Sequence, residues 1–251
     1  RGGIAVAKAS AETVKRVGQE LGGKSANIIL DDTDIAVAVA EGIDYCMDNT
    51  GQSCNAPTRM LVPNDKLDIA IEAARVAANN ILIDDPAKSG GHLGPVVNKV
   101  QFDKIQGLIQ VGIDEGATLV AGGTGRPEHL PTGYYVKPTV FADVNNDMNI
   151  AREEVFGPVL CMIPFDTEEE AIAIANDTVY GLTNYIQTQD SAKANRIARR
   201  LRSGMVEMNG TFRASGSPFG GYKQSGNGRE GGVWGLEDFL EVKSISGWSN
   251  D

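Results

Sequence analysis

Two short segments of the chain place a reactive side chain among glycines. Residues 20–25 read Glu-Leu-Gly-Gly-Lys-Ser, and residues 51–54 read Gly-Gln-Ser-Cys. Glycine lets a backbone approach a ligand more closely than a residue with a Cβ would allow. A cysteine thiolate is the best side-chain nucleophile near neutral pH, and partial burial raises the pKa of a glutamate toward the range of a general base. Cys54 and Glu20 are therefore the candidate nucleophile and the candidate base.

Each of these residues also has an ordinary structural interpretation. A free cysteine is more often a small buried hydrophobic residue, and a glutamate at the end of a helix is usually solvated. The polar, irregular neighbours of Cys54 argue against simple burial, and the Gly-Gly pair after Glu20 argues against a plain surface carboxylate. Cys46 on a helical face and Cys161 inside an apolar run have core surroundings, so we expect both to be packing residues.

The elements that must position these loops alternate along the chain. Short apolar runs between longer helical patterns predict an α/β fold with an open, largely parallel, twisted sheet flanked by helices. Strands are expected at residues 26–30, 59–62, 118–120, 135–141, 159–164, 182–187 and 205–208. Helices are expected at residues 4–17, 35–49, 64–80, 98–115, 167–175 and 192–201. Loops at the ends of parallel strands should gather on one edge of the sheet, the edge where α/β proteins place their sites.

Composition excludes several classes of partner. The formal net charge of -10 repels nucleic acids and anionic lipids, and the sequence has neither a signal peptide nor a membrane-spanning run. Its three cysteines cannot form a disulfide framework, and His92 and His129 lie in separate loops far from any metal-ligand cluster. We therefore expect a cytoplasmic protein with no metal, no nucleic acid and no membrane as partners.

The two glycine-rich segments resemble the glutamate and cysteine signatures of the aldehyde dehydrogenase superfamily, in the family's order and spacing. Four later segments are similar to further blocks of that family, and they are residues 153–159, 176–182, 204–209 and 218–226. Six ordered blocks between Glu20 and Glu230 make coincidence negligible. The chain is identified as the C-terminal catalytic portion of an NAD(P)-dependent aldehyde dehydrogenase.

The resemblance implies a two-stage reaction on an aldehyde. The Cys54 thiolate adds to the carbonyl carbon, the Cys54 N–H holds part of the oxyanion, and a hydride leaves for NAD or NADP. A water that Glu20 deprotonates then hydrolyses the thioester to a carboxylate. The family's cofactor contacts correspond here to Glu154, Phe156, Leu21, Gln101 and Lys104. Its residues for substrate contact or structural support correspond to Asn209, Phe212, Arg213 and Phe219.

The same resemblance divides the chain into parts. Residues 1–19 correspond to the last helix of a cofactor-binding domain, residues 20–238 to the catalytic domain, and residues 239–251 to a C-terminal oligomerisation strand. The full-length enzyme is expected to form a homodimer or homotetramer. The first residue is Arg1 rather than methionine, and most of the cofactor-binding half of the family is absent from the sequence. We therefore expect the isolated chain to be weak or inactive as a dehydrogenase.

Other interpretations remain open at the level of sequence. Glu20, Lys24 and Cys54 also match the residue types of nitrile and amide hydrolases, and a non-catalytic scaffold is a third possibility. Arg213 could pair with the carboxylate of a semialdehyde or could simply face solvent. Residues 226–231 fit the glycine pattern of a dinucleotide-binding fingerprint, but they lie too near the chain end to open a full βαβ unit, and we reject that motif.

Overall fold

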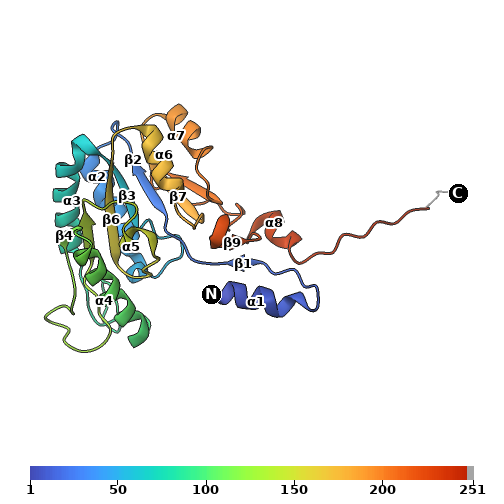
Figure 1. The fold of residues 1–251 in the computed structure, drawn as a ribbon, viewed down its shortest axis with the longest axis horizontal. Helices are drawn as coiled ribbons and strands as arrows, with labels where there is room; N and C mark the ends of the chain where they lie inside the picture. Colours follow the sequence, from blue (N-terminus) through green and yellow to red (C-terminus); the bar gives the residue numbers. More distant parts are fainter. Residues whose placement is uncertain (248–251) are drawn as a thin grey trace.

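The computed structural model describes residues 1–247, and its main body is built on one sheet (Figure 1). Within the described residues this sheet has seven strands in the order β4-β5-β6-β3-β2-β7-β8. The strands are β2 (Ala26–Ile29), β3 (Arg59–Pro63), β4 (Thr118–Ala121), β5 (Thr139–Ala142), β6 (Val159–Phe165), β7 (Thr183–Gln187) and β8 (Met205–Met208). Neighbouring strands are parallel except β4 and β5, which are antiparallel. The expected open, largely parallel α/β sheet is confirmed.

Helices cover both faces of the sheet and create two hydrophobic cores. On one face lie α2 (Ile35–Met47) and α3 (Leu67–Asn80); on the other lie α4 (Lys99–Asp114), α5 (Asn149–Arg152), α6 (Glu168–Asn176) and α7 (Ser191–Ala198). Adjacent strand residues face opposite cores: Ile28 packs in the α4–α7 core, and Ile29 packs in the α2–α3 core. Because both faces are covered, β2 and β3 are buried along their whole length.

Side-chain caps start several of these helices. The cap of α2 is Asp34, and not Asp31 or Asp32, which the sequence also suggests. Asp34 accepts a hydrogen bond from the N–H of Val37, and Thr167 accepts one from the N–H of Glu170. The Glu170 carboxylate reaches back to the N–H of Asp166, which completes a variant of the expected capping box. These contacts satisfy N–H groups that have no partner inside the helix.

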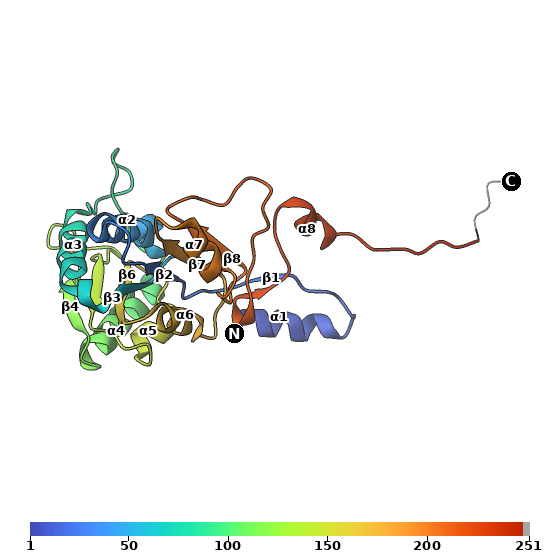
Figure 2. The same ribbon diagram turned by 90° about the horizontal axis from the view of Figure 1, so that it is seen from above.

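A smaller arrangement at one end joins the two ends of the chain. Strand β1 (Gln19–Glu20) pairs antiparallel with β9 (Gly226–Asn227), next to the 3₁₀ turn η3 (Lys223–Ser225). Helices α1 (Gly2–Ala11) and α8 (Gly232–Glu237) lie beside this pair, away from the main body in both ribbon views (Figures 1 and 2). The glycines at 226–231 therefore form a strand and a turn, not the opening of a βαβ unit.

Some predicted boundaries are wrong. The first helix ends at Ala11 and not at residue 17, since Val14 has a φ of 55°, which a continuing helix cannot contain. The expected helix at 64–80 begins with a 3₁₀ turn at Asn64–Lys66, and the strand expected at 135–141 is confined to β5. Within the described residues, no helix is long and apolar enough to cross a membrane.

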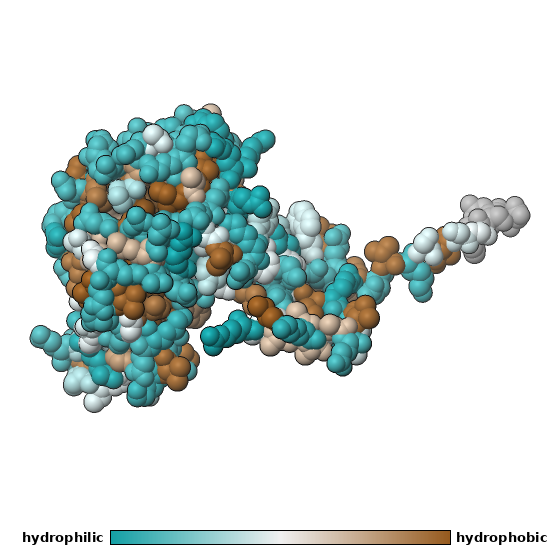
Figure 3. All heavy atoms as spheres, in the orientation of Figure 1, coloured by the Kyte–Doolittle hydropathy of each residue, from teal (hydrophilic) through white to brown (hydrophobic). Residues whose placement is uncertain are grey.

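The terminal segment forms no strand in residues 239–247, and residues 248–251 lie outside the described part. Residues 239–247 lead away from the body, and Figure 3 shows hydrophobic atoms along this segment. Val242 is fully exposed and Phe239 is 87% exposed. A lone strand has no backbone partner for its ladder hydrogen bonds. The oligomerisation strand at 239–251 therefore stays a prediction.

Core packing predicts a clear contrast between two identical substitutions. Phe141 has no exposed surface and packs against Gly112 and Ile150 of neighbouring helices, so Phe141→Ala should lower the free energy of unfolding by about 3–5 kcal/mol. The control, Phe239→Ala, removes the same ring from an exposed position and should change stability by less than about 0.5 kcal/mol. Urea denaturation followed by circular dichroism measures both; equal losses would contradict the assigned core.

Candidate active site

The two glycine-rich loops meet at one edge of the sheet. Residues 20–25 lead into β2, and residues 51–58 lead into its parallel neighbour β3. A Cβ at Gly23 would collide with the carbonyl oxygen of Cys54, so the two backbones are in direct contact. The loops gather on one edge of the sheet, as expected. That edge is not the carboxyl edge, where α/β proteins usually place their sites. This site lies at the amino ends of the strands, because each reactive residue precedes its strand.

A third loop completes this edge. Residues 154–157 lead into β6, which pairs with β3. Gly51 has a φ of 67°, and a Cβ there would collide with the carbonyl of Gly157. The sharp turn η1 (Asp48–Gly51) after α2 therefore packs the Cys54 loop directly against the loop that contains Glu154 and Phe156.

The Cys54 thiol and the Glu20 carboxylate are neighbours that shift each other's titration. Burial, followed by the interaction with Glu20, raises the pKa of Cys54 to about 12, while the N–H groups of Cys54 and Asn55 lower it. Burial also raises the pKa of Glu20, and the interaction with Cys54 partly opposes that rise. One Glu20 carboxylate oxygen is buried without a hydrogen-bond partner among the described residues. The proton therefore rests on sulfur, beside a carboxylate that can accept it.

A second carboxylate near Glu20 was missed by the sequence reasoning. The charge of Glu230 is one cause of the raised pKa of Glu20. The backbone N–H and carbonyl of Glu230 both form hydrogen bonds with the backbone of Phe219. In the sequence Glu230 appears only as an acidic residue inside a glycine-rich turn. Only the pairing of β9 with β1 brings it to Glu20, which lies more than 200 positions earlier in the chain.

The residues expected to contact a cofactor come together around the loop before β6. The Glu154 carboxylate accepts a hydrogen bond of 2.9 Å from the N–H of Gly23, and burial raises its pKa. The Lys104 ammonium donates to the carbonyl of Glu154, and the Gln101 amide donates to the carbonyls of Val155 and Phe156. Phe156 has a φ of 56°, an uncommon value for a bulky side chain. The Leu21 side chain packs against Gly3 of α1, while the next residue, Gly22, lies against the Glu154 carboxylate.

Aromatic rings form a wall beside the nucleophile loop. Tyr45 of α2 packs edge-on against Tyr185 of β7 at 5.3 Å and against Phe212 at 5.6 Å. The Tyr185 hydroxyl donates to the carbonyl of Asn55, the residue after Cys54. Phe212 was expected near the site. Tyr45 and Tyr185 were not, because their positions in a helix and a strand carry no local sign of this contact.

The remaining expected residues have structural partners. Asn209 bonds both backbone groups of Thr188 at 2.9 Å, which ties the end of β8 to the end of β7 at the opposite edge of the sheet. The Arg213 guanidinium lies over the Phe219 ring at 5.5 Å and bonds the carbonyl of Ser217. The contacts of Asn209 lie away from the candidate site, so its supporting role stays a prediction, while Arg213 and Phe219 contact each other within one segment.

Two of the three cysteines and the lysine of the base segment are buried. Cys46 and Cys161 have no exposed surface, which confirms them as core residues. Lys24 is 2% exposed, and its ammonium has no hydrogen-bond partner among the described residues. Among the described residues, this ammonium therefore makes no hydrogen bond to Cys54 or Glu20. Among the residues that the structure describes, no His, Cys, Asp and Glu cluster could hold a metal ion.

Comparisons with known proteins agree with this geometry. The model of the aldehyde dehydrogenase family matches residues 1–245. A 3-succinoylsemialdehyde-pyridine dehydrogenase from a Pseudomonas species is 52% identical over 248 residues, which cover 99% of this chain and 52% of that protein. The chain therefore belongs to the aldehyde dehydrogenase family, and it spans about half the length of the curated relatives it matches.

Solved structures show the same fold. A variant of aldehyde dehydrogenase C from Pseudomonas syringae, in complex with NAD+ and octanal, matches with a TM-score of 0.97 and 51% identity, covering 99% of this chain and 51% of that chain. An aldehyde dehydrogenase from Bartonella henselae matches with a TM-score of 0.95 and 57% identity, covering 98% of this chain and 52% of that one.

The raised thiol pKa predicts how Cys54 reacts with iodoacetamide. With a pKa of about 12, the alkylation rate should rise about tenfold per pH unit between about pH 7 and pH 10, without a plateau. Glu20→Gln removes a negative charge that disfavours the thiolate, so the pKa should fall and alkylation at a given pH should be faster. Mass spectrometry of the Cys54 peptide measures the rate, while buried Cys46 and Cys161 should stay unmodified. Identical profiles for the two proteins would contradict the pairing.

The contact between the two loops predicts a severe effect of one methyl group. Gly23→Ala should push the Cys54 segment away, with a loss of about 1–3 kcal/mol of stability and roughly 100-fold of Cys54 acylation by an activated ester. The matched control is Gly107→Ala in α4, where a Cβ meets open space; it should gain about 0.5–1 kcal/mol and keep full acylation. Normal acylation in Gly23→Ala would show that the loops are not in contact.

Proposed function

We propose that the chain is the catalytic part of an NAD(P)-dependent aldehyde dehydrogenase, which oxidises an aldehyde to a carboxylate. The observation that carries this proposal is the direct backbone contact between the loops of Glu20 and Cys54, at Gly23 and the Cys54 carbonyl, and the raised pKa values of both side chains support it. Because the chain spans about half of its curated relatives, the activity, substrates and partners of the whole protein are part of the proposal.

In the first stage Cys54 acts as the nucleophile. Glu20 accepts the thiol proton, and sulfur bonds to the aldehyde carbon to give a tetrahedral thiohemiacetal. The N–H of Cys54 holds part of the oxyanion in this proposal, and its lowering effect on the pKa of the thiol supports that role. Transfer of a hydride from that carbon then leaves a thioester on Cys54.

The cofactor that takes this hydride is NAD or NADP, and the loop before β6 fits its ribose. The Glu154 carboxylate is a hydrogen-bond acceptor suited to sugar hydroxyls, and it lies across Gly22 and Gly23, where a Cβ would clash with it. Phe156 can then pack beside the nicotinamide. Gln101 and Lys104 bond the carbonyls of this loop, so they act by holding Glu154 and Phe156 in place. Leu21, in the base segment, is the remaining proposed contact.

In the second stage Glu20 acts as a general base. After Glu20 has released the thiol proton to solvent, it takes a proton from water, and the water oxygen attacks the thioester carbon. The carbon–sulfur bond then breaks, Glu20 returns its proton to the Cys54 sulfur, and the acid product leaves as a carboxylate after losing its own proton to solvent. The raised pKa of Glu20 favours this step, because a carboxylate with a higher pKa is a stronger proton acceptor.

The substrate meets the aromatic wall of Tyr45, Tyr185 and Phe212. This wall favours an aldehyde with an apolar chain, and octanal in the similar Pseudomonas syringae structure agrees with that choice. Arg213 already bonds within its own loop, so no observation favours a semialdehyde carboxylate there. For the whole protein we propose a cytoplasmic homodimer or homotetramer. For the 251 residues alone we propose weak dehydrogenase activity.

Ester hydrolysis by this chain tests the two residues without a cofactor. With 4-nitrophenyl acetate, Cys54 should be acetylated in a burst that Cys54→Ala abolishes. Glu20→Gln should slow deacylation by about 10²–10⁴-fold, so that acetylated protein accumulates and is detected by mass spectrometry. The control Glu41→Gln, on the exposed side of α2, should deacylate normally. Equal deacylation by Glu20→Gln and the parent chain would exclude Glu20 as the base.

A further inference from the structure

A buried arginine connects the nucleophile segment (residues 51–58) to the base segment (residues 20–25). Arg59 opens β3 shortly after Cys54 and has no exposed surface. Its Nε donates to the carbonyl of Lys24 at 2.9 Å, in the segment that also holds Glu20. Strand β2 starts only at Ala26, so this bond extends the contact between the two segments beyond the backbone ladder.

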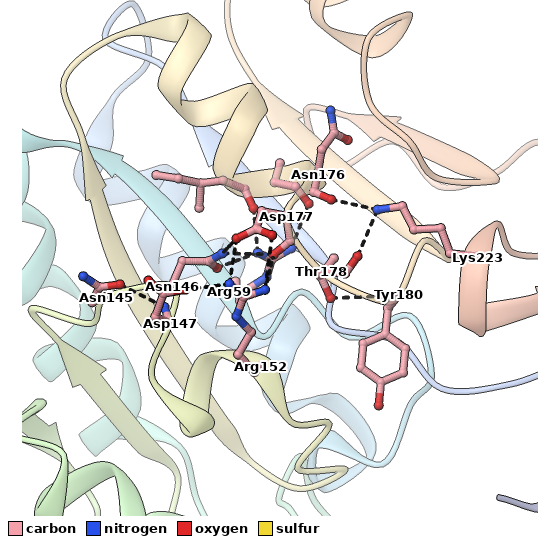
Figure 4. Close-up of polar contacts among 12 residues, drawn as sticks. Arg59, Asn145, Asn146, Asp147, Arg152, Asn176, Asp177, Thr178, Tyr180 and Lys223 are labelled. Atoms are coloured by element: carbon pink, nitrogen blue, oxygen red, sulfur yellow. Dashed lines mark hydrogen bonds and ion pairs between the residues drawn. The ribbon is translucent and has the colours of Figure 1, made fainter.

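The rest of the guanidinium is held by the C-terminal end of α6 (Figure 4). Nη1 donates to the carbonyl of Ile174 and to Asn146, and Nη2 donates to the carbonyl of Ala175, all within 2.9 Å. Burial lowers the pKa of Arg59 to about 10, and the charge of Asp177 opposes that shift. The last carbonyls of a helix lack partners within it and carry partial negative charge, so they suit a buried cation.

A second cation, Lys223, bonds carbonyls at and just after the C-terminal end of the same helix. The Lys223 ammonium donates to the carbonyls of Asn176 at 2.7 Å and Thr178 at 3.1 Å (Figure 4). Lys223 opens η3, and Ser225 of this turn donates to the carbonyl of Gly22 and accepts from the N–H of Leu21. The base segment is thus linked to the C-terminal end of α6 twice, through Arg59 at Lys24 and through the turn η3 at Gly22.

We propose that the C-terminal end of α6 sets the position of Glu20 relative to Cys54, and that Arg59 is a positioning residue for the reaction. Arg59 acts through the Lys24 carbonyl, and none of its hydrogen bonds reaches the thiol or the Glu20 carboxylate. This inference rests on the proposed roles of Cys54 and Glu20. A helix that contributes no reactive residue would therefore govern the contact between nucleophile and base.

The variant Arg59→Met, which keeps the length and loses the donors, tests this inference on the whole chain. Freed from its anchor, Glu20 should move away from the thiol. The pH profile of Cys54 alkylation should then shift to lower pH, as it does in Glu20→Gln, and deacylation of acetyl-Cys54 should slow by about 10–100-fold. The double variant should match Glu20→Gln alone, because both changes remove one interaction.

Controls separate positioning from general loss of stability. Arg75→Met removes an exposed arginine that pairs with Glu72 on α3 and should leave both measurements unchanged. If Arg59→Met does not fold, Asn146→Ala, which removes one acceptor of Arg59, should give a smaller shift in the same direction.

Two outcomes overturn the inference, and they differ in what else they exclude. A folded Arg59→Met or Asn146→Ala chain with the parent profile and the parent deacylation rate, beside an altered Glu20→Gln, excludes the positioning role alone. An unaltered Glu20→Gln excludes the proposed function together with it.

Discussion

The close approach of two backbones, at Gly23 and Cys54, is the constraint on which the site depends. Strands β2 and β3 are parallel neighbours, so the loops that precede them start from the same edge of the sheet. Any side chain at Gly23 would separate these loops, and the carboxylate of Glu20 would lose the thiol of Cys54. Gly51 provides the second close approach, which adds the loop of Glu154 and Phe156.

Burial raises the pKa values of the acids Cys54 and Glu20 and lowers the pKa of the base Arg59. It keeps the Cys54 proton on sulfur and makes Glu20 a better proton acceptor, so the resting pair is neutral thiol beside carboxylate. The same burial would be unfavourable for the cation of Arg59, but carbonyls at the end of α6 and the side chain of Asn146 satisfy it. Backbone carbonyls therefore compensate the Arg59 cation, whereas one Glu20 carboxylate oxygen has no hydrogen-bond partner among the described residues.

Much of the fold could be predicted because its signals are local. Alternating apolar runs gave the strands of the parallel sheet, and the capping residue Thr167 marked the start of α6. The failures were places where local pattern was insufficient. Val14 ends the first helix through a backbone angle, and residues 239–247 form no strand despite their alternating apolar pattern.

The sequence by itself determined which residues are chemically reactive and which glycines stand beside them, because residue type and spacing are properties of the chain. It therefore singled out Cys54 and Glu20. Only the tertiary structure decided that the site lies at the amino edge, that Glu230 and Tyr185 join it, and that Arg59 links its segments. Those contacts follow from the strand order β3-β2-β7 and from the pairing of β1 with β9, which join residues far apart in the chain and leave no periodic trace in it.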